Sequence, residues 1–197
     1  MELPELLVAD AGHWRQWLVD NHATSSGVVV VLAKKGVVAP TSLSYAEALE
    51  EALCFGWIDG RIEVRDDNTF RRRFTPRGPR SRWSQRNTSI AERLLVEQRM
   101  HPSGLDAILQ AKADGRWAAA YAGQASSSVP DDLMAALRAS PRAWEMFHSL
   151  TSANRYAILY HIDSVKRADT RRRRIERYVE MLARGETIHP QTRKPAR

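Results

Sequence analysis

Cysteine is almost absent from this chain, since Cys54 is the only one among 197 residues. A single cysteine excludes an intrachain disulfide, and with it the class of small secreted domains that disulfides stabilise. Long apolar runs are also missing: the longest, Val28 to Ala33, is far shorter than the roughly 20 residues that cross a bilayer. The N-terminus has no basic segment followed by an apolar run, so no signal peptide is expected. These absences predict a cytoplasmic protein without a membrane span.

The spaced motifs of common catalytic and cofactor sites are missing too. The six histidines do not form pairs such as HxxxH, and one cysteine cannot form CxxC. No GxGxxG, Walker loop or GxSxG occurs. We therefore predict no metal site and no cofactor and assign no catalytic residue, while the question whether the chain is an enzyme stays open.

Basic residues are scarce only at the front of the chain. Residues 1–60 hold three basic and eight acidic residues, whereas residues 61–197 hold 27 basic and 15 acidic ones. A basic surface can bind nucleic acid, but solvated arginines on helix faces produce the same composition and are the favoured interpretation. The densest run, Arg171–Arg174, contains no aromatic residue of the kind that stacks on single strands. It is better explained as a solvated face on which Arg171 or Arg174 holds the back of the chain to the front.

Hydrophobic periodicity predicts an α+β front part, with a small, mostly antiparallel sheet and packed helices. Trp14 and Trp17 lie on one face of the first helix and are expected to anchor the core. Cys54 is expected to be a buried apolar residue rather than a nucleophile, because it lies near the C-terminus of its helix. Helices are predicted at 11–22, 44–56, 84–99 and 103–115, a strand at 27–35, and a hairpin formed by 57–64 and 69–75.

The back of the chain is predicted to be a separate helical module. The Ser-rich segment 124–129 (QASSSV) is the best candidate for a domain boundary, and Pro130 opens the module after it. The predicted division is an α+β domain over 1–124, a three-helix module over 125–190 and a basic tail over 191–197. Apolar residues at helical spacing supply the core of this module.

The stretch from Cys54 to Asn87 concentrates tryptophan, arginine and helix-start signals, and the candidate site lies there. Guanidinium groups match carboxylate and phosphate oxygens, and a helix N-terminus such as that at Ser84 favours an anion. We predict a pocket for a small anionic or aromatic-anionic ligand, with a solvated basic hairpin as the alternative. The predicted ligand-binding residues are Trp57, Asp59, Arg71, Arg73, Arg77, Trp83, Ser84 and Asn87.

Strand alternation makes this prediction specific. Phe70, Arg72 and Phe74 should share one face of their strand, so Arg72 needs a carboxylate partner. Asp59 is the nearest candidate; it is either a structural partner of an arginine from 71–77, which is favoured, or a general base of an enzyme.

The same alternation predicts the orientation of the neighbouring strand. Ile58 should face the core, while Trp57 and Asp59 face the returning loop 76–87, with Trp57 partly exposed.

Several motifs occur along both halves of the chain: Trp14-x-x-Trp17-Leu18, ALCFGWIDG at 52–60, FTPR at 74–77, SxWSxxN at 81–87, GRW at 115–117, Pro130-x-x-Leu133, Ala143-x-x-x-Phe147 and Lys166-Arg167-x-x-Thr170-Arg171. In these motifs the chain resembles the YdeI/OmpD-associated family, also called bacteriocin-protection proteins. The resemblance implies a role in tolerance of bacteriocins or antimicrobial stress and an association with an outer-membrane porin, and it specifies no reaction.

Overall fold

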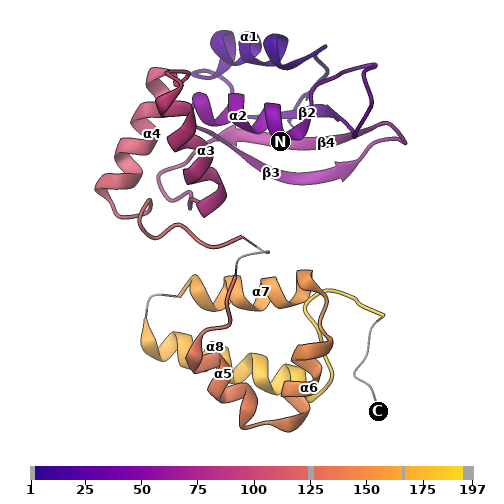
Figure 1. Ribbon diagram of the computed structural model, residues 1–197, viewed down its shortest axis with the longest axis vertical. Coiled ribbons are helices and arrows are strands. Elements are labelled where there is room, and N and C mark those ends of the chain that lie inside the picture. The colour runs from indigo at the N-terminus through magenta and orange to yellow at the C-terminus, as the bar shows by residue number, and fades with distance from the viewer. Residues whose placement is uncertain (1–2, 124–126, 166, 193–197) are drawn as a thin grey trace. The chain divides into compact units, whose positions relative to one another are not determined.

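The computed structural model describes residues 3–123, 127–165 and 167–192 (Figure 1). The chain forms two compact units, Met1–Ala120 and Tyr121–Arg197. The first unit combines a four-stranded sheet with helices, and the second is helical, so the predicted α+β fold class is confirmed. Residues 124–126 of the Ser-rich segment, Lys166 and residues 193–197 of the basic tail lie outside the described residues.

The sheet of the first unit has the strand order β1-β2-β4-β3. β1 pairs in parallel with β2, and the other two pairs are antiparallel, so the sheet is mixed but mostly antiparallel as predicted. The predicted hairpin is confirmed, because β3 pairs with β4 from Trp57 opposite Pro76 to Val64 opposite Phe70. The strands are β1 (Glu5–Leu6), β2 (Val28–Ala33), β3 (Trp57–Val64) and β4 (Thr69–Pro76).

Helices α1 and α2 lie on one face of this sheet (Figure 1). Trp14 is fully buried there, donates from Nε1 to the Ala48 carbonyl at 3.1 Å, and contacts Phe74 of β4. Trp17 stacks on Trp14, and Cys54 is buried in the same core, where burial raises the pKa of its thiol. The predictions for these three residues are confirmed. The helices are α1 (Ala11–Asn21), α2 (Tyr45–Cys54), α3 (Gln85–Val96) and α4 (Pro102–Ala113).

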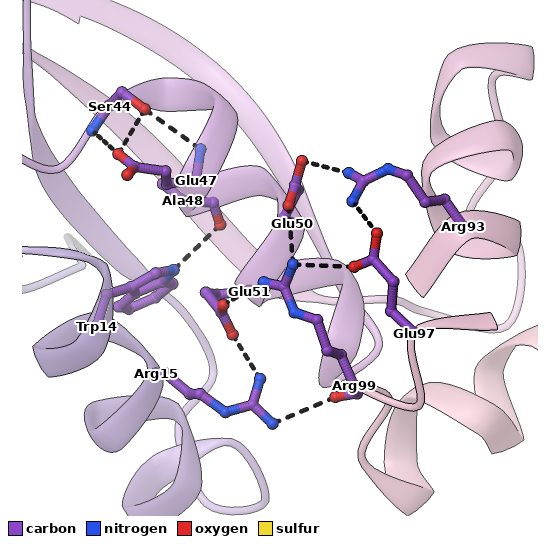
Figure 2. A network of polar contacts seen from close by, with 10 residues as sticks. All are labelled: Trp14, Arg15, Ser44, Glu47, Ala48, Glu50, Glu51, Arg93, Glu97 and Arg99. Carbon is purple, nitrogen blue, oxygen red and sulfur yellow. Dashed lines mark hydrogen bonds and ion pairs between the residues drawn. The ribbon is translucent and has the colours of Figure 1, made fainter. Parts of the chain in front are cut away.

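A network of ion pairs ties α1, α2 and the end of α3 together (Figure 2). Glu51 of α2 is its centre: one carboxylate oxygen accepts from Arg15 at 2.6 Å and the other from Arg99 at 2.6 Å. Glu50 binds Arg93 and Arg99 beside it. The Glu51 side chain is only 9% exposed, so the two guanidinium groups offset the cost of burying its carboxylate.

The second unit contains four helices among its described residues, not the predicted three. Pro141 is the reason: it starts α6 at a first-turn position, where a proline fits, and so separates α6 from α5. Apolar side chains of all four helices form one core, which includes Leu133, Phe147, Ile158 and Ile175. The helices are α5 (Asp131–Arg138), α6 (Pro141–Ser149), α7 (Ser152–Asp163) and α8 (Ala168–Ala183).

A buried asparagine holds the last described segment of the second unit in place. Asn154 of α7 accepts from the His189 backbone N–H at 2.8 Å and donates to the His189 carbonyl at 3.0 Å and to Gln191 Oε1 at 2.8 Å. The segment after α8 is thereby held against the start of α7.

The arginine run is held inside the second unit. Arg171 binds Asp132 and Asp163, and Arg174 donates to the His161 carbonyl. Both residues therefore have partners in their own unit.

Candidate functional site

The eight predicted site residues do not form one site, because the pleat of the hairpin divides them between the two sheet faces. Trp57 belongs to the core under the helices, and Asp59 bonds to Tyr45 of α2, so both face the helix-covered side. Their shared face is as predicted, but the orientation of that face is reversed. Trp57 is 1% exposed instead of partly exposed, and Ile58 is half-buried and outside the core.

Local structure explains this reversal. α2 ends at Cys54, and Gly56 adopts a φ of +74°, a conformation in which glycine is favoured. The chain turns directly from α2 into β3, so the first residue of the strand lies against the helix that precedes it. Trp57 is that residue.

Asp59 is a structural partner and does not resemble a free base. It binds Arg72 and accepts from Tyr45 Oη at 2.8 Å. The Arg72 guanidinium also lies over the Tyr45 ring, with 4.5 Å between Cζ and the ring centroid. Burial and the charge of Asp59 raise the pKa of Tyr45 to about 12, so its hydroxyl remains a donor. The predicted pairing of Asp59 with an arginine from 71–77 is confirmed, and it gives the arginine between two phenylalanines a carboxylate partner, although the buried Arg72 Nε has no hydrogen-bond partner among the described residues.

Four of the predicted site residues lie together at the start of α3, where they pack against one another instead of lining a pocket: Arg77, Trp83, Ser84 and Asn87. The Arg77 guanidinium lies 3.6 Å from the Trp83 ring centroid, and Trp83 is only 1% exposed. Ser84 caps α3 by accepting from the Asn87 N–H at 3.1 Å, and both residues are buried. The ring face on which a ligand would stack is therefore covered by Arg77.

Arg71 and Arg73 point to the other side of the sheet, which we call the outer face, opposite to α2. They line a groove of about 490 Å³ whose walls come from the N-terminal segment and all four strands. A β-bulge between Asp59 and Ile62 places Gly60 and Arg61 opposite Arg73, and this irregularity adds a third arginine to the groove. The lining residues are Leu3, Glu5, Val29, Arg61, Glu63, Arg71 and Arg73; we call this the outer-face groove.

Two carboxylates partly neutralise the outer-face groove. Arg71 lies 3.3 Å from Glu5 and 3.5 Å from Glu63, and Arg61 lies 3.5 Å from Glu63. Arg73 pairs with no carboxylate among the described residues, and the buried Nε of Arg71 has no hydrogen-bond partner there. The groove thus offers one unpaired guanidinium and one partly satisfied guanidinium.

Two family models match the chain. Residues 6–107, which hold the whole groove apart from Leu3 and Glu5, match a family described as a domain of unknown function (DUF8412). The chain belongs to the DUF8412 family. Residues 126–185 match the family described as bacteriocin-protection, YdeI or OmpD-associated, so the resemblance predicted from the sequence is confirmed in the second unit. No curated protein and no solved structure matches the chain.

A second groove of about 300 Å³ also lies in the DUF8412 part, where α1, the start of β3 and α4 meet. His22 lies in its wall, with Nδ1 2.9 Å from the Leu18 carbonyl. His101 stacks on Phe55, and its ring centroid lies 4.5 Å from that of His22. Burial and the charges of His22 and Arg15 lower the pKa of His101. Arg77 is the only arginine or lysine among the described residues that line this groove, and its side chain is stacked on Trp83.

The described residues form no group of three or more His, Cys, Asp or Glu side chains that could hold a metal ion. Nor does any helix they form have both the length and the apolar character to cross a membrane. On α8, Arg171 and Arg172 are each paired with aspartates, so this part of the basic run is not a bare cationic stripe.

Proposed function

We propose that this protein binds a small anionic ligand in the outer-face groove, through Arg73 with Arg61 and Arg71. The observation that carries the proposal is Arg73: it lies in a hollow with two other arginines and pairs with no carboxylate among the described residues. A guanidinium presents a planar set of N–H donors that matches carboxylate and phosphate oxygens. A ligand anion would supply the partner that Arg73 lacks.

The rest of the groove suits binding rather than catalysis. Leu3 and Val29 provide an apolar wall on which a ligand body can lie. Glu5 and Glu63 are the carboxylates among the described lining residues, and each is engaged in ion pairs with arginine. The proposal is therefore a binding protein without a catalytic step.

Calorimetric titration of the full chain tests the proposal. The panel is acetate, phenylacetate, succinate, inorganic phosphate and phenyl phosphate. Arg73→Gln should weaken the binding of the best ligand about tenfold, because it removes charge-assisted hydrogen bonds. Arg172→Gln is the matched control, since it removes one positive charge from an exposed site in the other unit. Equal affinity of the wild type and Arg73→Gln would exclude the groove as the binding site.

The description of the family that matches residues 126–185 suggests a cellular readout. We propose that protection against a bacteriocin depends on ligand binding in the groove. Cells that produce the wild type should survive a bacteriocin better than cells that produce Arg73→Gln at the same level. Equal survival would show that protection does not depend on the groove, whether or not calorimetry detects a ligand there.

A further inference from the structure

We infer that the outer-face groove selects monocarboxylates over doubly charged anions, because Glu5 and Glu63 neutralise two of its three arginines. This inference rests on the proposed function and deepens it: the proposed function says that an anion binds, and the inference says which class. Glu5 and Glu63 then act as specificity-determining residues.

Backbone pairing holds both carboxylates in place. Glu63 is opposite Arg71 in the β3–β4 hairpin, and its two oxygens lie 3.5 Å from Arg61 and 3.5 Å from Arg71. It therefore bridges two arginines that belong to adjacent strands.

Glu5 belongs to β1, far from the hairpin in the sequence. β1 pairs with β2 at Glu5 opposite Val29, and the Val29 N–H donates to the Pro4 carbonyl at 2.9 Å. The Glu5 carboxylate lies 3.3 Å from Arg71 and 3.3 Å from Arg65, which does not line the groove. The N-terminal segment thus places a counter-ion beside the ligand position.

The net charge of the groove explains why a singly charged ligand should be preferred. Among the described residues that line the groove, three guanidinium groups and two carboxylates leave one positive charge, centred on Arg73. A monocarboxylate neutralises that charge, whereas a dianion leaves one negative charge close to Glu5 and Glu63. The apolar wall of Leu3 and Val29 adds a preference for a carboxylate with an apolar body.

The discrimination should be modest. The Glu5 and Glu63 side chains are 40% and 42% exposed, so water and salt screen their charges. We expect a preference of about fivefold for the monocarboxylate at low ionic strength, which should shrink when salt is added.

Two ligands with similar bodies test the inference: phenylacetate, a monoanion, and phenyl phosphate, which is a dianion at pH 8 because its second pKa is about 6. Affinities are measured by calorimetry for the full-length wild type, Glu5→Gln and Glu63→Gln. The wild type should prefer phenylacetate. Each variant should bind phenyl phosphate about fivefold more tightly, with a smaller change for phenylacetate.

Glu145→Gln is the matched control, since Glu145 is an exposed residue of α6 in the second unit and the substitution changes the net charge equally. It should leave the preference unchanged. Circular dichroism shows whether each variant is folded, and the two groove variants lie on different strands, so one remains informative if the other misfolds.

The outcomes distinguish a failure of the proposed function from a failure of the charge inference alone. If neither ligand binds the wild type or any variant, the proposed function fails. If binding is lost in Arg73→Gln but the preference is the same in Glu5→Gln, Glu63→Gln and the wild type, only the charge inference fails. A wild type that prefers phenyl phosphate overturns the inference directly.

Discussion

The helices of the two units begin in different ways. In the first unit each of the four helices has a side chain that accepts a backbone N–H of the first turn, from Asp10, Ser44, Ser84 and His101. Among the described residues of the second unit, only α7 has such a bond from its N-cap residue, Thr151, while in α5 Asp132 inside the first turn accepts from the Leu133 N–H at 2.9 Å. Uncapped helix starts depend on packing and solvent for their free N–H groups. The first unit therefore encodes its helix boundaries locally, and the second obtains them from its core.

The two units also differ in the polar groups that they bury. The first unit buries Glu51 between two arginines, whereas the aspartate that Arg171 binds in the second, Asp132, is 47% exposed. The second unit uses a neutral group in the equivalent role, since Asn154 is only 1% exposed and holds the chain after α8. Charge thus stabilises the interior of one unit and an amide that of the other.

The largest effect is expected for Glu51→Gln, which removes the buried carboxylate that Arg15 and Arg99 share and leaves Arg99 with Glu50 and Glu97 only. Breaking a buried ion pair from one side should lower the free energy of unfolding of the first unit by about 3 kcal/mol. The same change in the second unit, Asp132→Asn, removes an exposed partner and should cost less than about 1 kcal/mol. Hydrogen exchange of the slowest amides in each unit measures both. Equal losses would contradict the comparison.

Asn154→Ala should destabilise the second unit by about 2 kcal/mol, since it leaves the backbone groups of His189 without their partners. Proteolysis should then cut the chain after α8 sooner than in the wild type. Asn21→Ala is the control in the first unit, because Asn21 donates only to the Trp17 carbonyl of its own helix. A similar loss of stability from both substitutions would show that Asn154 has no particular role in holding the segment after α8.

A pair of serine substitutions tests the helix starts. Ser44 forms a capping box with Glu47, with 3.3 Å from the Glu47 N–H to the Ser44 hydroxyl, so Ser44→Ala should cost about 1 kcal/mol. Ser140 precedes α6 without a capping hydrogen bond, so Ser140→Ala should change the stability by less than about 0.5 kcal/mol. Urea unfolding of both variants decides the matter. If Ser140→Ala has the larger effect, capping does not distinguish the units.

The smallest effect concerns pH and His101, whose Nδ1 accepts from the Ser103 N–H at 3.3 Å and caps α4 only when it is neutral. Burial and the charges of His22 and Arg15 lower the pKa of His101, so the unfolded chain binds the proton more readily than the folded one. Stability should be full above the unfolded pKa of about 6.5 and should fall as the pH drops through the lowered folded value.

His101→Asn keeps an acceptor at the cap and removes the titration. Thermal unfolding of the first unit between pH 7.5 and 5.5 should then become flatter than in the wild type. His161 in the second unit also has a lowered pKa, because of burial and Arg174, and it supplies the internal comparison. An unchanged pH profile of the first unit would remove His101 as its cause.

Much of the fold followed from local patterns. The alternation of Phe70, Arg72 and Phe74 predicted correctly which side chains of β4 share a face, and the serine at 44 marked the start of α2. The site followed less well. Alternation says which residues share a face but not which face a helix covers, so the orientation of Trp57 was reversed. The bulge that adds Arg61 to the groove and the approach of Glu5 left no pattern that we could read.

The sequence by itself determined most of the helices and strands, the helix starts at Ser44 and Ser84, the hairpin and the need of Arg72 for a carboxylate, because these depend on residues close together in the chain or on the period of a strand. Only the tertiary structure decided that Trp57, Trp83 and Asn87 are buried and that Arg71 and Arg73 lie in an open groove. The reason is physical: burial depends on where α2 packs on the sheet, and the charge of the groove depends on Glu5, which lies 66 positions from Arg71 in the chain. Contacts across such a separation arise from packing, and no local spacing records them.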